Sequence, residues 1–427
     1  MYTSIRVDHS LLAVESEHRV HAMLEVTAPD VEGVERPALH LALVIDRSGS
    51  MGRGKLDAAK DAARFLVDRL GSDDSLALVA FDSEVSLLAP AASPDKDRLT
   101  AVIDSIRTAG MTNLSGGWLK GAEELRRVDG DGQRRVLLLT DGHANVGVTN
   151  GGQLAGMAQG IRGERISTTT IGFGRDFDED LLTTMADAGG GNGYFAEGPD
   201  DAPGIFDEEF EGLATVSAQN VSVEIAPISD VKFIGVLNEY PMVSTTSGVQ
   251  VELGDFYGGE LRRVVFEFAV PNVADLGPKH VANVVLRYAT IDDPVEMHEV
   301  TIPIHVNVVE ADEASGAEAD REVVDEVLIL KAAEDRKRAR DLADAGRYDE
   351  AADILDVRGR TMSESMPGST RAADMAVEMD EMRYSTERMR SREYDLYDKK
   401  RMHYESQRNR RSKPRKEWEN PDDKDKW

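Results

Sequence analysis

Apolar residues between positions 37 and 217 follow two alternating spacings. Four runs are predicted strands: Leu39–Ile45, Ser75–Phe81, Arg135–Leu139 and Ser167–Phe173. The first is an almost continuous apolar run, as is typical of a central parallel strand buried on both faces. Between these strands, apolar residues recur at the three- and four-residue spacing of amphipathic helices. The predicted helices are Lys55–Leu70, Asp97–Arg107, Leu114–Val128, Gly152–Ile161, Asp178–Ala188 and Phe206–Val216. This alternation predicts a Rossmann-like, doubly wound parallel sheet over residues 37–217, with Val85–Leu88 and Tyr194–Ala196 as short additional strands.

Beyond Ser217 the pattern changes to strands alone. The segments from Val221 to Val308 alternate or are β-branched, which predicts an all-β sandwich over residues 218–310. Residues 1–36 also have the pattern of strands, most clearly at His18–Val26. We expect these N-terminal strands to join the sandwich, so that the α/β domain is inserted between its two parts.

The C-terminal region is predicted to be α-helical. Residues 311–380 contain an acidic linker followed by a helical hairpin that turns at Gly346, and one segment of this hairpin resembles a single tetratricopeptide-type unit. Residues 381–427 hold 15 Lys and Arg against 11 Asp and Glu. Mixed charge with few apolar residues predicts a charged tail, helical or disordered and largely solvated.

Composition narrows the function classes. The chain has 427 residues, 41% of them hydrophobic, which is enough to build two or three units with buried cores. The formal net charge of −29 disfavours non-specific binding to nucleic acids or anionic membranes and favours divalent cations. Cysteine is absent, which excludes disulfides, thiolate catalysis and cysteine-bound zinc. No secretory signal or membrane-length apolar run is visible, so we expect a cytoplasmic protein without a membrane segment.

Oxygen-bearing side chains stand where the predicted parallel strands end. Asp46, Ser48 and Ser50 follow the first strand, Thr112 lies between two helices, and Asp141 follows the third strand. Loops at the carboxyl ends of such strands converge on one crevice. Two carboxylates and three hydroxyls suit a hard cation such as Mg²⁺, whereas zinc prefers sulfur or imidazole ligands.

These motifs, in this order, resemble the von Willebrand factor A (VWA) domain, here of a prokaryotic intracellular type with a flanking β-sandwich and a helical C-terminus. The resemblance covers about residues 37–217. It implies a metal-ion-dependent adhesion site (MIDAS) in which the five residues hold one Mg²⁺, with Mn²⁺ or Ca²⁺ as other choices. The acidic pair that forms a second metal site in some integrins is absent, because Gly52–Lys55 occupies that position.

The resemblance also implies a binding function. The metal captures an Asp or Glu side chain of a partner protein, and the chain acts as a scaffold within a multiprotein assembly that includes an ATPase or a signalling enzyme. The rim residues expected to contact the partner are Arg47, Met51, Met111, Asn113 and His143.

The sequence lacks the motifs that the considered classes of enzyme require. Phosphatases of the haloacid-dehalogenase type need a second acid two residues after the first, and Ser48 stands there instead. There is no P-loop motif, no G-x-S-x-G elbow and no readable hydrolase triad. The glycine-rich segment Gly189–Gly193 is interpreted as a helix-ending turn rather than a phosphate cradle. We therefore expect no catalytic residues and no enzyme.

A nucleic-acid-associated protein is the alternative function. The basic stretch Arg408–Lys416, with Tyr394, Tyr397, Tyr404 and Trp418 around it, offers charge and stacking surfaces. In that case the VWA site is structural or secondary.

Overall fold

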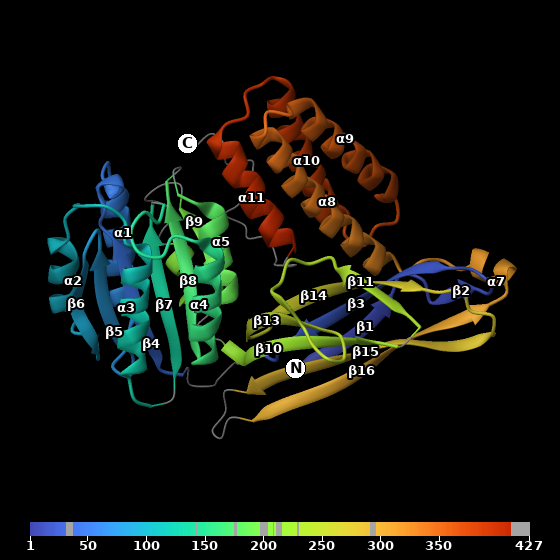
Figure 1. Ribbon diagram of the computed structural model, residues 1–427, viewed down its shortest axis with the longest axis horizontal. Helices are drawn as coiled ribbons and strands as arrows, with labels where there is room; N and C mark the ends of the chain where they lie inside the picture. Colours follow the sequence, from blue (N-terminus) through green and yellow to red (C-terminus); the bar gives the residue numbers. More distant parts are fainter. Residues whose placement is uncertain are drawn as a thin grey trace.

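The computed structural model describes residues 1–30, 37–130, 132–141, 143–174, 177–196, 204–207, 209–210, 216–228, 230–290 and 296–410. They form an α/β domain, a β-sandwich and a helical bundle that lies against both (Figure 1). Strands from before and after the α/β domain build the sandwich, so the predicted insertion is confirmed.

The sheet of the α/β domain has the strand order β6-β5-β4-β7-β8-β9. The strands are β4 (Leu39–Asp46), β5 (Ser75–Phe81), β6 (Val85–Ala92), β7 (Gln133–Thr140), β8 (Ile166–Phe173) and β9 (Gly190–Ala196). All neighbours pair in parallel except β6, which is antiparallel to β5. The predicted doubly wound sheet is therefore confirmed. Strand β9 is longer than the expected Tyr194–Ala196, because its pairing with β8 already begins at Gly190.

Helices cover both faces of this sheet, because successive strand residues point to opposite sides. Leu43 belongs to the core under α1 and α2, and its neighbour Val44 to the core under α3, α4 and α5. The helices are α1 (Lys55–Arg69), α2 (Lys96–Ser105), α3 (Leu114–Arg126), α4 (Gly151–Gly163) and α5 (Glu179–Ala188). Of the predicted closing helix 206–216, residues 206–207 and 209–210 are helical, but Val216 already begins β10.

The sandwich consists of two sheets with the strand orders β1-β3-β14-β11 and β12-β13-β10-β15-β16-β2. Its strands are β1 (Tyr2–Val7), β2 (Leu11–Ala13), β3 (His18–Thr27), β10 (Val216–Pro227), β11 (Lys232–Val236), β12 (Met242–Ser244), β13 (Val249–Tyr257), β14 (Leu261–Val270), β15 (Gly277–Thr290) and β16 (Met297–Val309). Strand β3 pairs with β14 along its whole length, from His18↔Val270 to Thr27↔Leu261. This long-range pairing joins the two halves of the sandwich.

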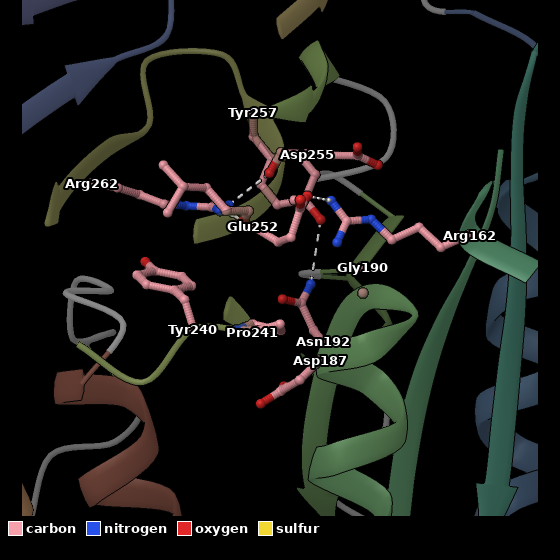
Figure 2. Close-up of a pocket in the computed structure, with 13 residues that line it drawn as sticks. Arg162, Asp187, Gly190, Asn192, Tyr240, Pro241, Glu252, Asp255, Tyr257 and Arg262 are labelled. Atoms are coloured by element: carbon pink, nitrogen blue, oxygen red, sulfur yellow. Dashed lines mark hydrogen bonds and ion pairs between the residues drawn. The ribbon is translucent and has the colours of Figure 1, made fainter. Parts of the chain in front are cut away.

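Buried charges connect the sandwich to the α/β domain, at the sheet end opposite the strand carboxyl termini. Arg135, near the start of β7, is completely buried; it forms an ion pair with Glu209 and lies 3.6 Å from Asp255 of β13. Figure 2 shows the neighbouring pocket, where Arg162 of α4 and Glu252 of β13 form an ion pair at 3.2 Å. Buried charges are tolerated only when they are paired, so these contacts restrict the relative orientation of the α/β domain and the sandwich.

The helical bundle corrects one expectation. It consists of α8 (Arg321–Asp344), α9 (Tyr348–Ser365), α10 (Ala372–Arg390) and α11 (Leu396–Arg410), whereas the short helix α7 (Ala311–Ser315) lies against β2 of the sandwich (Figure 1). A solvated tail over 381–427 is wrong as far as Arg410, because α10 and α11 bury a methionine face that includes Met382, Met389 and Met402. Residues 411–427 lie outside the described residues. Within the part of the chain that the structure describes, no helix is long and apolar enough to cross a membrane.

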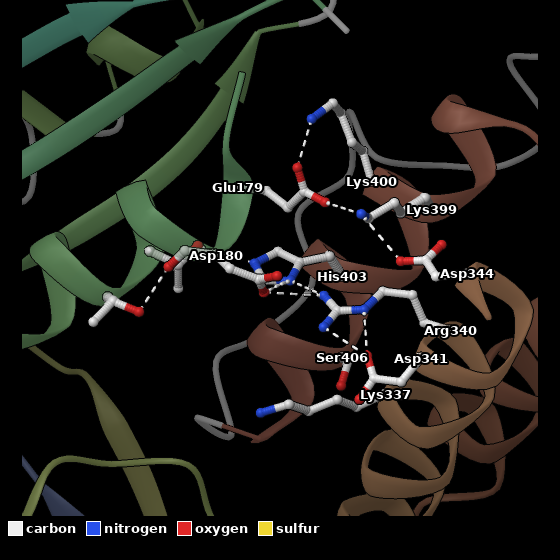
Figure 3. Close-up of polar contacts among 12 residues, drawn as sticks. Glu179, Asp180, Lys337, Arg340, Asp341, Asp344, Lys399, Lys400, His403 and Ser406 are labelled. Carbon is white, nitrogen blue, oxygen red and sulfur yellow. Dashed lines mark hydrogen bonds and ion pairs between the residues drawn. The ribbon is translucent and has the colours of Figure 1, made fainter. Parts of the chain in front are cut away.

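Helix α11 packs against the start of α5 in the α/β domain (Figure 3). The ammonium group of Lys400 donates to Glu179 Oε2 and to the carbonyl oxygen of Phe177, both at 2.8 Å. It also lies 3.9 Å from the centre of the Phe177 ring. One turn further along α11, the ring of Tyr404 stacks on Phe195 of β9 at 5.6 Å. A charge expected on a solvated surface is thus a buried structural cation.

His403 lies at the centre of the same contact. Its Nε2 is 3.0 Å from the hydroxyl of Thr183, its Nδ1 faces the guanidinium of Arg340, and Asp180 is 3.4 Å away. Burial, followed by the positive charge of Arg340, lowers the pKa of His403 from 6.5 to about 4. His403 is therefore neutral in the folded protein at neutral pH.

We predict that acid weakens the contact between α5 and α11. The unfolded chain protonates His403 near pH 6.5 and the folded chain only near pH 4, so stability falls as pH drops through this window. The loss at pH 5 is about 2 kcal/mol. Urea unfolding at pH 7.5 and pH 5 should show a smaller loss for His403→Gln than for wild type. Equal losses in both proteins would contradict this role of His403.

Candidate metal centre

Three loops meet where the parallel strands end. Asp46 is the last residue of β4 and Thr140 the last residue of β7, and these strands are neighbours in the sheet. Asp141 directly follows β7, while Ser48 and Ser50 belong to the short 3-10 turn after β4. Parallel pairing of β4 with β7 therefore brings the two aspartates to one edge of the sheet.

A chain of hydrogen bonds connects four of the five candidate ligands. The hydroxyls of Ser48 and Ser50 are 3.0 Å apart, and Ser50 donates to Asp141 Oδ1 at 2.8 Å. Asp46 accepts from the backbone N–H of Ser48 at 2.7 Å and from the hydroxyl of Thr140 at 2.5 Å. Ser50 is exposed, whereas both aspartates have no exposed surface. The cluster thus has a buried acidic base and an open top.

The fifth candidate ligand, Thr112, lies in the loop that leads into α3. This loop is joined to the first one, because the N–H of Gly49 donates to the carbonyl of Gly110 at 3.2 Å. Gly110 has φ +61°, a conformation that glycine adopts without strain. Thr112 is 3% exposed, and the hydrogen bonds described for it are made by its backbone with Asn145 and Val146. The structure therefore places Thr112 in the adjoining loop without a described side-chain contact to the other four.

Comparison with known families identifies this arrangement. The model of the von Willebrand factor type A domain matches residues 40–208, a segment that contains the sheet and all five candidate ligands. The chain carries a VWA domain. Domains of this family generally mediate protein–protein interaction, often in a metal-dependent way.

The sequence identity to known relatives is low. The chain is 26% identical over 264 residues to the uncharacterized protein YfbK of Escherichia coli (strain K12), a match that covers 60% of this chain and 46% of that protein. The match thus spans about half the length of this relative.

Two solved structures share the fold. The von Willebrand factor type A protein from Catenulispora acidiphila has a TM-score of 0.66 at 19% identity, covering 85% of this chain and 88% of that one. The ArnB paralog VWA2 from Sulfolobus acidocaldarius has a TM-score of 0.64 at 17% identity, covering 96% and 98%. At this coverage the likeness extends beyond the VWA domain to the sandwich and the helical bundle.

The donor set of the VWA domain fits a hard divalent cation. It combines the carboxylates of Asp46 and Asp141 with the hydroxyls of Ser48, Ser50 and Thr112, and all five are oxygen donors. No group of three or more His, Asp or Glu side chains placed to hold a metal occurs among the described residues. A cation held here therefore needs the hydroxyls as ligands beside the two carboxylates.

Burial and neighbouring charge set the electrostatics of the two aspartates. Burial, with a smaller contribution from the negative charge of Asp141, raises the pKa of Asp46 from 3.8 to about 6, against the lowering effect of its hydrogen bonds. Asp141 has a different partner, because the ammonium of Lys55 donates to its Oδ2 at 2.6 Å. Lys55 is the first residue of α1, and a side chain at Gly174 would meet its Cε at 2.8 Å, so Gly174 leaves room for it.

The structure changes the predicted rim of the site. Met111 is 52% exposed and the side chain of His143 is 67% exposed, so both are open to a partner. Arg47 is partly exposed and forms an ion pair with Asp82 at 2.9 Å. Met51 has no exposed surface and belongs to the core under α1, so it cannot contact a partner in this conformation. Asn113 caps α3 by accepting from the N–H of Gly116 at 3.0 Å, which is a structural task.

Sequence reasoning missed three residues that support the site. Thr140 donates to Asp46, Asn145 accepts from the N–H of Thr112 at 2.8 Å, and Lys55 pairs with Asp141. The sequence offered a signal for Thr140, since it is the polar residue between an apolar strand and the candidate ligand Asp141. Lys55 and Asn145 had none, because their positions in space depend on how α1 and the loop after β7 pack.

We predict that Lys55→Met binds Mg²⁺ more tightly than wild type, by about tenfold, because it removes a positive charge beside a carboxylate ligand. The same change should lower the melting temperature in EDTA, since the buried Asp141 loses its counter-charge. Isothermal titration and thermal unfolding measure the two effects, with Lys96→Met, an exposed lysine on α2, as the matched control. Weaker Mg²⁺ binding by Lys55→Met would instead mean that Lys55 positions Asp141 for the metal.

Proposed function

We propose that the VWA domain binds a partner protein through one divalent metal ion, Mg²⁺ in the first place, at the cluster formed by Asp46, Ser48, Ser50, Thr112 and Asp141. The observation that carries this proposal is the hydrogen-bond chain from Ser48 through Ser50 to Asp141, which gathers oxygen donors over two buried carboxylates at an exposed edge. A bound ion would supply an open coordination position that attracts an Asp or Glu side chain of the partner.

The residues of the chain divide this task. Asp46 and Asp141 provide the negative charge, and Thr140 and the N–H of Ser48 hold the Asp46 carboxylate in place. Ser50 is the exposed ligand, so it marks the side from which a partner carboxylate approaches. Met111 and His143 stand exposed at the rim and offer further contacts.

Binding rather than catalysis is part of this proposal. The four oxygen atoms of Asp46 and Asp141 each accept a hydrogen bond from a protein donor. Each oxygen keeps a second lone pair that can bind a cation at the open top of the cluster. We place the partner in a cytoplasmic multiprotein assembly.

The nucleic-acid alternative is not supported. Two of the residues expected to stack on bases are used inside the protein. The ring of Tyr404 stacks on Phe195, and Tyr394 packs with the bundle core beside Tyr348. Most of the basic stretch Arg408–Lys416 lies outside the described residues.

The proposal is tested by affinity capture from native lysate with tagged protein, in Mg²⁺ and in EDTA. We expect a partner that wild type retains only in Mg²⁺ and that Asp46→Ala loses. Asp97→Ala, which removes an exposed carboxylate at the start of α2, is the matched control and should behave as wild type.

Thermal unfolding of the same proteins separates loss of metal from loss of fold. Mg²⁺ at about 100 times its Kd should stabilise wild type by about 2.7 kcal/mol and leave Asp46→Ala unaffected. Partners that persist in EDTA and with a folded Asp46→Ala would refute metal-dependent capture.

A further inference from the structure

A groove runs beside the metal centre on the α1 side. One wall is formed by Met51–Gly54, Leu56, Asp57, Lys60 and Arg64, and the other by Asp104 at the end of α2 and Ile106–Thr108 after it. The first wall directly follows Ser50 and the second leads into the loop of Thr112. The two loops are also joined, because the N–H of Ala109 donates to the carbonyl of Arg47 at 2.7 Å. The groove and the metal centre therefore share one rigid base.

Positive charge dominates this groove. Its lining contains four cations, Arg53, Lys60, Arg64 and Arg107, and two carboxylates, Asp57 and Asp104. The whole chain carries a formal charge of −29, so a net positive groove is a local reversal of the general surface. A positively charged groove attracts anionic ligands.

Three of the four cations do not form an ion pair among the described residues. The exception is Arg64, which forms an ion pair with Asp104 at 2.6 Å. The side chain of Lys60 donates to the backbone carbonyl of Asp104 at 3.4 Å, and that of Arg107 donates to the carbonyl of Ile106 at 2.8 Å. Burial and then the charge of Arg107 lower the pKa of Lys60, and the charges of Asp57 and Asp104 act in the opposite direction.

Arg53 is exposed and stands closest to the ligand loop in sequence. Its backbone has φ +58°, in the left-handed region where an arginine is strained and a glycine is not. Gly54, with φ +92°, follows it. An exposed cation thus lines the groove at a position where the backbone favours glycine.

We propose that this groove binds an acidic segment of the partner, several Asp or Glu residues that flank the one captured at the metal centre. The inference rests on the proposed function and names its partner more closely: an acidic peptide rather than a single surface carboxylate. Charge complementarity carries it, since the metal centre and the groove adjoin and both select negative charge. A nucleic-acid strand fits less well, because no aromatic side chain lines the groove in the described part of the chain.

The test measures binding of a fluorescein-labelled octaglutamate peptide by fluorescence anisotropy, in Mg²⁺ and in EDTA, at about 50 and 300 mM salt. Arg53→Glu/Arg107→Glu reverses the groove. Lys96→Glu/Arg98→Glu is the matched control with the same change of net charge, at the far end of α2 from the groove. Asp46→Ala removes a metal ligand in a third protein.

We expect wild type to bind the peptide, and the groove variant to bind it at least tenfold more weakly with a smaller salt dependence. The control variant should lose less than threefold. Asp46→Ala should retain salt-sensitive binding but lose the difference between Mg²⁺ and EDTA.

Three results would overturn the inference: no binding of the peptide to wild type, equal losses in the groove and control variants, or tighter binding of a single-stranded oligonucleotide of equal charge. The two proposals remain distinguishable. Groove-dependent binding that is the same in Mg²⁺ and EDTA would refute metal capture alone, and Mg²⁺-dependent binding that the groove variant retains would refute the groove alone.

Discussion

Two buried carboxylates at the ends of adjacent strands are the constraint around which the α/β domain is arranged. Parallel pairing of β4 with β7 puts Asp46 and Asp141 at the same edge of the sheet, where neither has any exposed surface. Like charges in this position are tolerated only if each has donors of its own. Thr140 and the Ser48 N–H serve one carboxylate, and Ser50 and Lys55 serve the other.

The same principle holds the three parts of the molecule together. At the amino-terminal end of the parallel strands, the buried Arg135 forms an ion pair with Glu209 and lies near Asp255 of the sandwich. At the opposite end, Lys400 of α11 is buried against Glu179 at the start of α5. Asp178, the N-cap of α5, lies 3.8 Å from His143 in the loop that follows Asp141. The helical bundle therefore contacts a helix that borders the candidate metal centre.

Much of this architecture could be read from local patterns. Continuous apolar runs such as Leu39–Ile45 identify strands buried on both faces, and the structure confirms the sheet they predict. The last two helices were harder to predict, because the residues that α10 and α11 contribute to the bundle core are methionines rather than leucine or valine. A signal was nevertheless present: Met375, Met382 and Met389 recur every seventh residue and all lie buried in the bundle. Seven residues make about two helical turns, so this spacing predicts a single buried face.

The sequence alone determined the order of strands and helices and the residue types at the strand ends, because spacing and loop position are local properties. It also placed Asp46, Ser48, Ser50, Thr112 and Asp141 at one edge of a sheet. Only the tertiary structure decided which charged side chains are buried and which face solvent. Lys400 and Arg53 are both cations in polar stretches, yet Lys400 is buried in an interface and Arg53 is exposed in the lining of a groove. The reason is that burial depends on contacts between segments far apart in the chain, and local periodicity carries no information about such contacts.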